Sequence, residues 1–316
     1  MNQYHNTAVG DIAQDVTKRA GENAIFIVYG IKETNDVTDK VKDVCANFSA
    51  MIRSMRNRFP DMKFSCTMGF GANAWKRLFP EQDNPAELET FKEIKGATHT
   101  AISTPGDLFF HIRSEQMGLC FEFASIIDEK LQGVVEPIDE THGFRYRDGR
   151  AIIGFVDGTE SPRVDENPYY FAVIGDEDKK FAGGSYVFVQ KYIHDMIAWN
   201  RLPVEEQEKV IGRRKFNDVE LSDAEKPANA HNAVSNIGDN LKIVRANMPF
   251  ANTSKGEYGT YFIGYASTFS TTRKMLENMF IGSPVGNTDR LLDFSTPITG
   301  TLFFVPSYEL LASLGE

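Results

Sequence analysis

The sequence is poor in cysteine, carries no excess of basic charge and contains no long apolar segment. Its 316 residues include only Cys45, Cys66 and Cys120, which are widely spaced and form no Cys-x-x-Cys pair. This spacing argues against a disulfide framework and against a cysteine-ligated zinc or iron–sulfur site. The net charge of −10 provides no basic stripe to neutralise phosphates, so we expect no nucleic-acid partner.

Apolar runs long enough to cross a bilayer, which takes about 20 residues, are also missing. The opening segment has neither the apolar core of a signal peptide nor a twin-arginine pair. We therefore expect no membrane partner and a cytoplasmic protein. The composition, 41% hydrophobic and 25% charged, is normal for a globular protein, and the length allows one large domain or two of ordinary size.

The first part of the chain predicts strands and helices in alternation. Short apolar, β-rich runs alternate with segments whose apolar residues recur at helical spacing. We expect strands at 24–30, 63–68 and 107–113, and helices at 37–59 and 117–131. With one strand left unplaced, this order indicates the β-α-β-β-α-β arrangement of a ferredoxin-like fold.

The second part repeats this scheme with insertions. Strands are expected at 151–155, 185–190, 241–246, 259–266 and 301–306, and helices at 193–199, 204–211, 271–279 and 308–314. The strands starting Asp107-Leu-Phe-Phe and Thr301-Leu-Phe-Phe look like equivalent positions of a duplicated unit.

We therefore predict an α+β protein of the dimeric α+β barrel type, with antiparallel sheets and flanking helices. Residues 1–140 would form an N-terminal ferredoxin-like half and residues 150–316 a C-terminal one. The polar stretch 136–149 would link them.

Six histidines are available as metal ligands. His231 ends a polar insertion at 212–233, and so long an insertion is expected in a compact domain only where it is functional. His194 has apolar neighbours and is interpreted as a satisfied structural histidine, and His111 as a packed or edge residue. The others are His5, His99 and His142.

The strongest functional signal is an aspartate between two glycines, in Gly154-Phe-Val-Asp157-Gly158-Thr159. Alone, Gly-x-x-Asp-Gly predicts an ordinary turn at the end of a strand. Here it is followed by His231 and then by Arg245-Ala-Asn247. In that order the residues could form the two faces of a haem iron site, with His231 on the iron and Asp157 and Arg245 handling peroxide.

These residues resemble the signature of the dye-decolourising peroxidases, a Gly-x-x-Asp-Gly motif with a downstream histidine ligand. The segment from Asp289 to Pro306 is similar to that family's closing segment. The chain looks most like the shorter bacterial branch, of type B or P. The resemblance covers most of the chain and is strongest after residue 150.

The resemblance implies a haem peroxidase with one haem b per chain, ligated by His231. Such an enzyme reduces hydrogen peroxide and oxidises dyes, phenols or other small one-electron donors through an oxo-iron(IV) porphyrin-radical intermediate. Asp157 would move the peroxide proton, and Arg245 would stabilise the departing hydroxide and hold a propionate. Asn247 would assist by hydrogen bonding to peroxide or to a water.

The resemblance also implies residues that hold the cofactor. The backbone and hydroxyl groups of Gly158, Thr159 and Glu160 would lie near the propionates, and Ser161 stands where the family usually has asparagine. Apolar haem contacts are expected from Phe262, Ile263 and Phe280.

An acid is expected to fix the second ring nitrogen of the histidine ligand. Asp293 is our choice for this acid. Asp289 is the alternative, unless it forms a salt bridge with Arg290.

Two other functions remain open. The protein could bind haem in order to carry it or release its iron, although a carrier has no need of Asp157 and Arg245 together. It could also be a colourless α+β protein with a small-molecule pocket, in which His231 binds no metal. A homo-oligomer, dimeric or larger, is expected because sheets of this kind tend to pack on one another.

Overall fold

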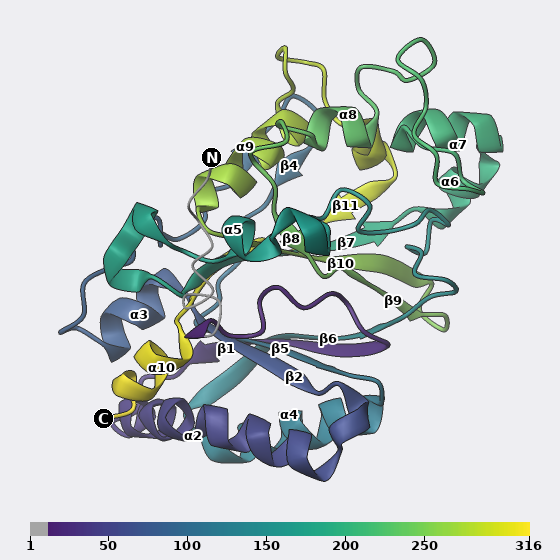
Figure 1. Cartoon of the computed structure of the whole chain (residues 1–316). Helices are drawn as coiled ribbons and strands as arrows, with labels where there is room; N and C mark the ends of the chain where they lie inside the picture. Colours follow the sequence, from purple (N-terminus) through teal and green to yellow (C-terminus); the bar gives the residue numbers. More distant parts are fainter. Residues whose placement is uncertain (1–11) are drawn as a thin grey trace.

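The computed structural model describes residues 12–316, so His5 and the opening segment lie outside the described part. Its first half has the predicted order of strands and helices (Figure 1). The elements are β1 (Asn23–Ile31), α2 (Val37–Arg58), β2 (Ser65–Phe70), β5 (Leu108–Ser114), α4 (Met117–Leu131) and β6 (Val135–Phe144). The connection from β2 to β5 carries α3 (Ala72–Leu78) and the small hairpin β3 (Ile94–Lys95) and β4 (Thr100–Ala101).

The second half contains α5 (Pro168–Ala172) ahead of its first strand. Its strands are β7 (Ser185–His194), β8 (Val244–Arg245), β9 (Met248–Asn252), β10 (Glu257–Ala266), β11 (Ser295–Pro297) and β12 (Thr301–Val305). Its helices are α6 (Met196–Arg201), α7 (Val204–Ile211), α8 (His231–Ser235), α9 (Phe269–Phe280) and α10 (Tyr308–Leu314), with a 3₁₀ turn, η4, at Arg290–Asp293.

The strands form one antiparallel sheet in the order β6-β1-β5-β2-β12-β7-β10-β8, with β9 also pairing with β10. Within each half the fourth strand of the unit lies beside the first, then the third, then the second. This 4-1-3-2 order is that of a ferredoxin-like unit, so the predicted fold class is confirmed. The duplicated unit is therefore visible in the topology.

The unplaced strand of the first half lies inside the stretch predicted as a linker. Residues 135–144 form β6, which pairs with β1 at the edge of the sheet. Most of its side chains are exposed or half-buried, and Pro137 is tolerated there because an edge strand has backbone groups that need no partner. An edge strand of this kind lacks the apolar pattern that sequence reading depends on.

Two other expectations about strands are wrong. Residues 151–155 form a tight loop, in which the Ala151 amide donates to the Phe155 carbonyl at 2.9 Å. Gly154 has a φ of 94° there, which other residues rarely adopt. The strands β5 and β12 are also not equivalent, because β5 is the third strand of its unit and β12 is the fourth of the other.

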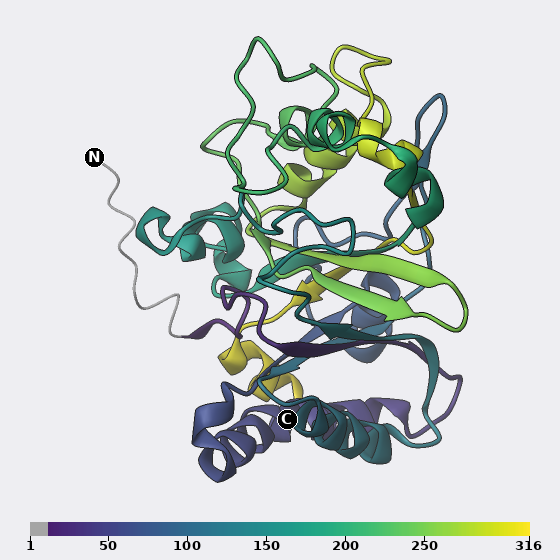
Figure 2. The same cartoon turned by 90° about the vertical axis from the view of Figure 1, so that its right-hand side faces the viewer.

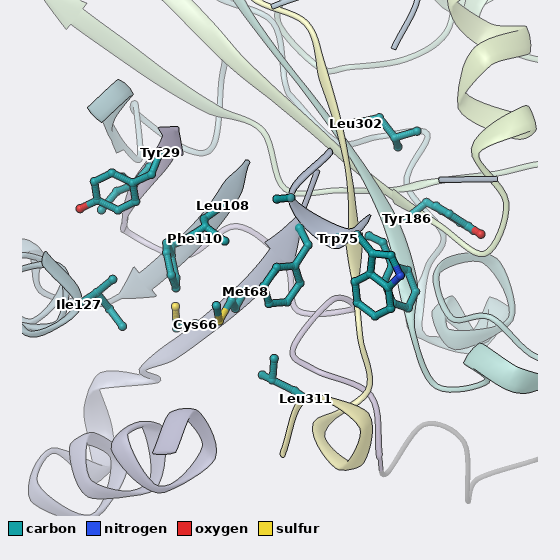
Figure 3. Close-up of a cluster of buried hydrophobic side chains, with 14 of the residues drawn as sticks. Tyr29, Cys66, Met68, Trp75, Leu108, Phe110, Ile127, Tyr186, Leu302 and Leu311 are labelled. Atoms are coloured by element: carbon teal, nitrogen blue, oxygen red, sulfur yellow. The ribbon is translucent and has the colours of Figure 1, made fainter. Parts of the chain in front are cut away.

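The two half-sheets pack face to face, with helices on their outer sides (Figures 1 and 2). Helices α2 and α4 cover the first half, and Figure 3 shows part of the apolar core beneath them, including Phe110 and Ile127. A second apolar cluster lies between the sheets, where the rings of Phe26 and Tyr261 stack at 4.0 Å. Within residues 12–316, no helix combines the length and apolar character that a membrane crossing requires.

The seam between the half-sheets is narrow. Strands β2 and β12 pair at a single position, Phe70 with Phe304. The buried side chain of Gln14 bridges the strands beyond it: Nε2 donates to the carbonyls of Met68 at 3.1 Å and Pro306 at 2.9 Å. Its Oε1 accepts from the Met68 amide at 2.8 Å. A side-chain amide thus replaces missing backbone pairing.

We expect Gln14→Ala to lower the free energy of unfolding by about 2 kcal/mol, because it leaves buried backbone groups unpaired. Denaturant unfolding measures the change. Gln132→Ala is the matched control, because that side chain is exposed, and it should stay within about 0.5 kcal/mol of the unchanged protein. Equal losses in the two variants would contradict the bridging role.

Candidate active site

A cavity of about 200 Å³ lies in the second half of the molecule. Its walls come from the loop that follows residue 150, strands β8 and β10, helices α8 and α9, and the η4 turn. Helix α9 contributes Thr272, Met275, Leu276 and Met279, which share one helical face because they are three or four residues apart.

His231 is the first residue of α8 and lines this cavity. Its Nδ1 lies 2.6 Å from Oδ2 of Asp289, whose side chain is fully buried. The other oxygen of Asp289 accepts from the Leu291 amide at 2.9 Å, which caps η4. Since a carboxylate only accepts hydrogen bonds, we assign the ring proton to Nδ1. Nε2 then has a free lone pair, and it has no protein partner within residues 12–316.

The choice of Asp293 as the partner of the histidine is wrong. Asp293 is 55% exposed and lies 3.0 Å from Nε2 of His99. Asp289 opens the 3₁₀ turn and Asp293 closes it, and four residues at three per turn place the two side chains in different directions. The alternative for Asp289, a salt bridge with Arg290, does not form, because Arg290 contacts Glu206.

Asp157 is held on the sheet side of the cavity by Asn247. The side-chain amide of Asn247 donates to Oδ1 of Asp157 at 3.1 Å, and its oxygen accepts from the Ile263 amide of β10 at 3.0 Å. Asn247 is therefore locked between a strand and the acid. Gly154 and Gly158, on either side of Asp157, have φ values of 94° and 79°, and these left-handed conformations produce the sharp loop.

A buried tryptophan supports this loop from behind. The Trp199 indole donates to the carbonyl of Ile153 at 2.9 Å. Its ring makes edge contacts with Phe155 at 6.1 Å and with Phe294 at 5.4 Å. Trp199 thereby connects the loop of Asp157 with the segment that follows the η4 turn.

Arg245 lines the cavity as an unpaired cation. Its backbone pairs with Gly264 of β10, and its amide donates to Oγ of Ser161 at 3.2 Å. Across residues 12–316 its guanidinium makes no hydrogen bond and no ion pair. A guanidinium without a protein partner is well suited to bind an anion or a polarised oxygen.

The expected cofactor contacts are present in part. Gly158, Thr159, Glu160 and Phe262 all line the cavity. Phe280 does not: it is one residue beyond the cavity face of α9 and belongs to the main apolar core. Ile263 also faces away, because side chains alternate along β10, and it lies in the cluster between the sheets.

Arg213 is a cavity residue that sequence reasoning missed. Although the basic run Arg213-Arg-Lys has the composition of a solvated loop, the Arg213 side chain is only 17% exposed. It binds Glu160 at 3.1 Å and Asp218 at 2.9 Å. Asp218 is close in the sequence, but Glu160 is 53 residues away, and this distant contact left no signal in the sequence.

His194 also lines the cavity, but both of its nitrogens are occupied. Nδ1 lies 2.7 Å from Oγ of Ser295 and Nε2 lies 2.9 Å from Oγ1 of Thr260. Burial lowers its pKa to about 4, so the ring is neutral at neutral pH. The prediction of a satisfied structural histidine is confirmed, and of these two cavity histidines only His231 has an unoccupied nitrogen.

We expect Asp289→Ala to lower the free energy of unfolding by about 2 kcal/mol, because it removes a turn cap and a buried charged acceptor. The matched control is Asp293→Ala, which removes an exposed pair and should cost less than about 1 kcal/mol. Chemical denaturation of both variants checks this. The assignment fails if Asp293→Ala costs as much as Asp289→Ala.

Comparison with known proteins identifies the family. Sequence profiles of the Dyp-type peroxidase N-terminal and C-terminal domains match residues 13–145 and 148–310. A dye-decolorizing peroxidase of Rhodococcus erythropolis is 50% identical over 308 residues, which is 96% of this chain and 89% of that protein.

Solved structures agree with these matches. A dye-decolorizing peroxidase from Bacteroides thetaiotaomicron is 81% identical, with a TM-score of 0.96 over 96% of this chain and 99% of that one. A variant of DypB from Rhodococcus jostii RHA1 in complex with haem is 45% identical, with a TM-score of 0.91 over 95% and 98% of the two chains. The chain therefore belongs to the dye-decolorizing, or Dyp-type, peroxidase family.

Proposed function

We propose that this protein binds one haem b in the cavity through Nε2 of His231 and reduces hydrogen peroxide at the expense of small one-electron donors such as dyes and phenols. The observation that carries the proposal is the pairing of His231 with the fully buried Asp289. A histidine whose Nδ1–H donates a hydrogen bond to a carboxylate is held in one orientation and becomes a stronger ligand through Nε2. The haem complex of the related DypB supports the same cofactor.

The residues present fit a haem. The cavity combines one available imidazole nitrogen, an unpaired guanidinium and apolar side chains that include Phe262, Met275 and Met279. An anionic propionate would satisfy Arg245, while the apolar side chains would contact the macrocycle. Bound haem supplies the redox-active iron, and the protein supplies ligation, proton handling and exclusion of water.

Proton handling falls to Asp157 and its neighbours. The carboxylate would accept a proton from bound peroxide and return it to the departing oxygen. Asn247 keeps Oδ1 of Asp157 in place through its 3.1 Å hydrogen bond, and the Arg245 guanidinium stabilises the negative charge that develops on the departing oxygen. A protein that merely carries haem would have no need of Asp157 and Arg245 together.

A homo-oligomer and a cytoplasmic location stay predictions. Sedimentation or light scattering of the purified protein checks the first, and fractionation of cells checks the second.

We expect His231→Ala to retain far less haem and to lose the Soret band of the histidine-ligated protein. The absorption spectrum after addition of haem measures both. His142→Ala is the control, because that histidine is on β6, where it pairs with Glu140. An unchanged Soret band in His231→Ala would overturn the ligand assignment, and the absence of a Soret band in the unchanged protein would overturn haem binding.

We expect Asp157→Asn to bind haem normally but to react with peroxide about 10²–10⁴ times more slowly, because proton transfer is lost. The rate at which the Soret band changes after peroxide is mixed in measures this. Asn247→Ala should have a smaller effect, because Asn247 only positions the acid. Asp165→Asn, at an exposed acid of the same segment, is the control. If the Soret band of the unchanged protein does not shift after peroxide is added, the result contradicts the proposal and favours haem carriage.

A further inference from the structure

A phenol and an imidazole are enclosed together between the two half-sheets. Tyr265 of β10 and His111 of β5 are both fully buried, and Oη of Tyr265 lies 2.9 Å from Nδ1 of His111. The two residues come from different halves of the chain and meet only because the sheets pack face to face. Neither residue lines the cavity, and the proposed peroxidase mechanism does not use them.

The protonation states of the pair follow from burial. Burial and the positive charge of Arg113 lower the pKa of His111 well below its usual value, so the imidazole is neutral. Burial raises the pKa of Tyr265, so the phenol keeps its proton. We assign the proton of the neutral imidazole to Nε2, so that Nδ1, the nitrogen beside the phenol, accepts the hydrogen bond. In this tautomer the hydrogen bond joins a protonated phenol to an available base.

Only one sheet separates this pair from the cavity. Gly264, which precedes Tyr265, is the backbone partner of the cavity residue Arg245. Side chains alternate along β10, so Phe262 faces the cavity and Tyr265 faces the layer between the sheets. Neighbouring strands lie about 4.8 Å apart, so the Tyr265 backbone is close to the cavity wall.

Burial keeps the pair out of contact with solvent, and one aromatic ring covers the imidazole. The Phe26 ring stacks on His111 at 4.7 Å and on Tyr261 at 4.0 Å, and all three side chains are buried.

Two other tyrosines lie close by but have no base to receive the proton. Tyr192 lines the cavity, but it donates to the amide oxygen of Gln190 at 2.6 Å. Tyr261 is in the same layer as Tyr265, and its hydroxyl makes no hydrogen bond to any of residues 12–316. The combination of phenol and base singles out Tyr265.

We propose that Tyr265 and His111 form an internal redox-active pair that gives an electron to the oxidising site in the cavity when no external donor is present. This inference rests on the proposed peroxidase function, which supplies the oxidant. The Tyr265 ring loses one electron to the cavity site, and its phenolic O–H bond breaks as the proton moves to Nδ1 of His111. The products are a neutral tyrosyl radical and an imidazolium, and the cavity site is reduced by one electron.

The surroundings make this step reversible. The same burial and the same Arg113 charge that keep His111 neutral destabilise its imidazolium. When an electron from a one-electron donor reaches the tyrosyl radical through the cavity site, the phenolic oxygen therefore takes back its proton from Nδ1 of His111. Because the radical is shielded from solvent and from bulky donors, it stores an oxidising equivalent rather than delivering it to a substrate. The pair thus protects the protein interior during turnover without a donor.

The test is the electron paramagnetic resonance spectrum of haem-loaded protein frozen after one equivalent of peroxide, without a donor and with ring-deuterated tyrosine incorporated. We expect a tyrosyl signal that is lost in Tyr265→Phe and retained in Tyr261→Phe, a matched control on the same strand and in the same layer. His111→Gln, which keeps a hydrogen-bond acceptor but removes the base, should also lose the signal. Thermal unfolding and the Soret band verify that each variant is folded and loaded.

The outcomes separate the two proposals. An unchanged Soret band after peroxide means that the peroxidase function itself fails. A Soret band that responds, together with a tyrosyl signal that survives in Tyr265→Phe or is absent from the unchanged protein, overturns the redox pair alone. Loss of the signal in Tyr265→Phe but not in His111→Gln overturns the role of His111 as the base.

Discussion

The site depends on one buried carboxylate. Asp289 is fully desolvated, and a charge in that position is stable only when its oxygens are hydrogen-bonded. One oxygen accepts a hydrogen bond from the His231 ring, and the other accepts one from the backbone of η4. Helix α8 is thereby fixed to the turn, although His231 and Asp289 are 58 residues apart. The position of the imidazole in the cavity follows from this bond.

Strand β10 organises the rest of the second half. Its Phe262 side chain faces the cavity, while Tyr261, Ile263 and Tyr265 face the layer between the sheets. Its backbone also holds Asn247, and through Asn247 the carboxylate of Asp157. Proton handling on one face and the phenol–imidazole pair on the other therefore share one rigid element. A shift of β10 would move both together.

Much of the fold could be predicted from the sequence. Helices α4, α7 and α10 match their predicted bounds, because apolar residues at helical spacing are a strong signal even in short segments. The fourth strand of the first half was hidden because β6 is a polar edge strand. The loop at 151–155 was interpreted as a strand because it is apolar. Its apolar side chains are in fact buried around Trp199 and not in a sheet.

Part of the candidate site could also be predicted from the sequence, and part could not. The Gly-x-x-Asp-Gly motif and the order of the residues after it were enough to predict four site residues. All four line the cavity: Asp157, His231, Arg245 and Asn247. The proximal acid was misplaced because the choice between Asp289 and Asp293 depends on the phase of a 3₁₀ turn, which spacing alone does not give. Phe280 was misplaced by one position of a helix for the same kind of reason.

The bridge made by Gln14 has a consequence for how the chain is synthesised. Its two carbonyl partners are 54 and 292 residues away, so Met68 is synthesised soon after Gln14 and Pro306 is synthesised much later. Until β12 is made, β2 is an open edge of the first half-sheet, and open edges invite pairing with other chains. Gln14 already occupies both backbone groups of Met68 on that edge. Gln14 thus covers part of the β2 edge in the first half-sheet, and the same side chain becomes part of the seam once β12 is in place.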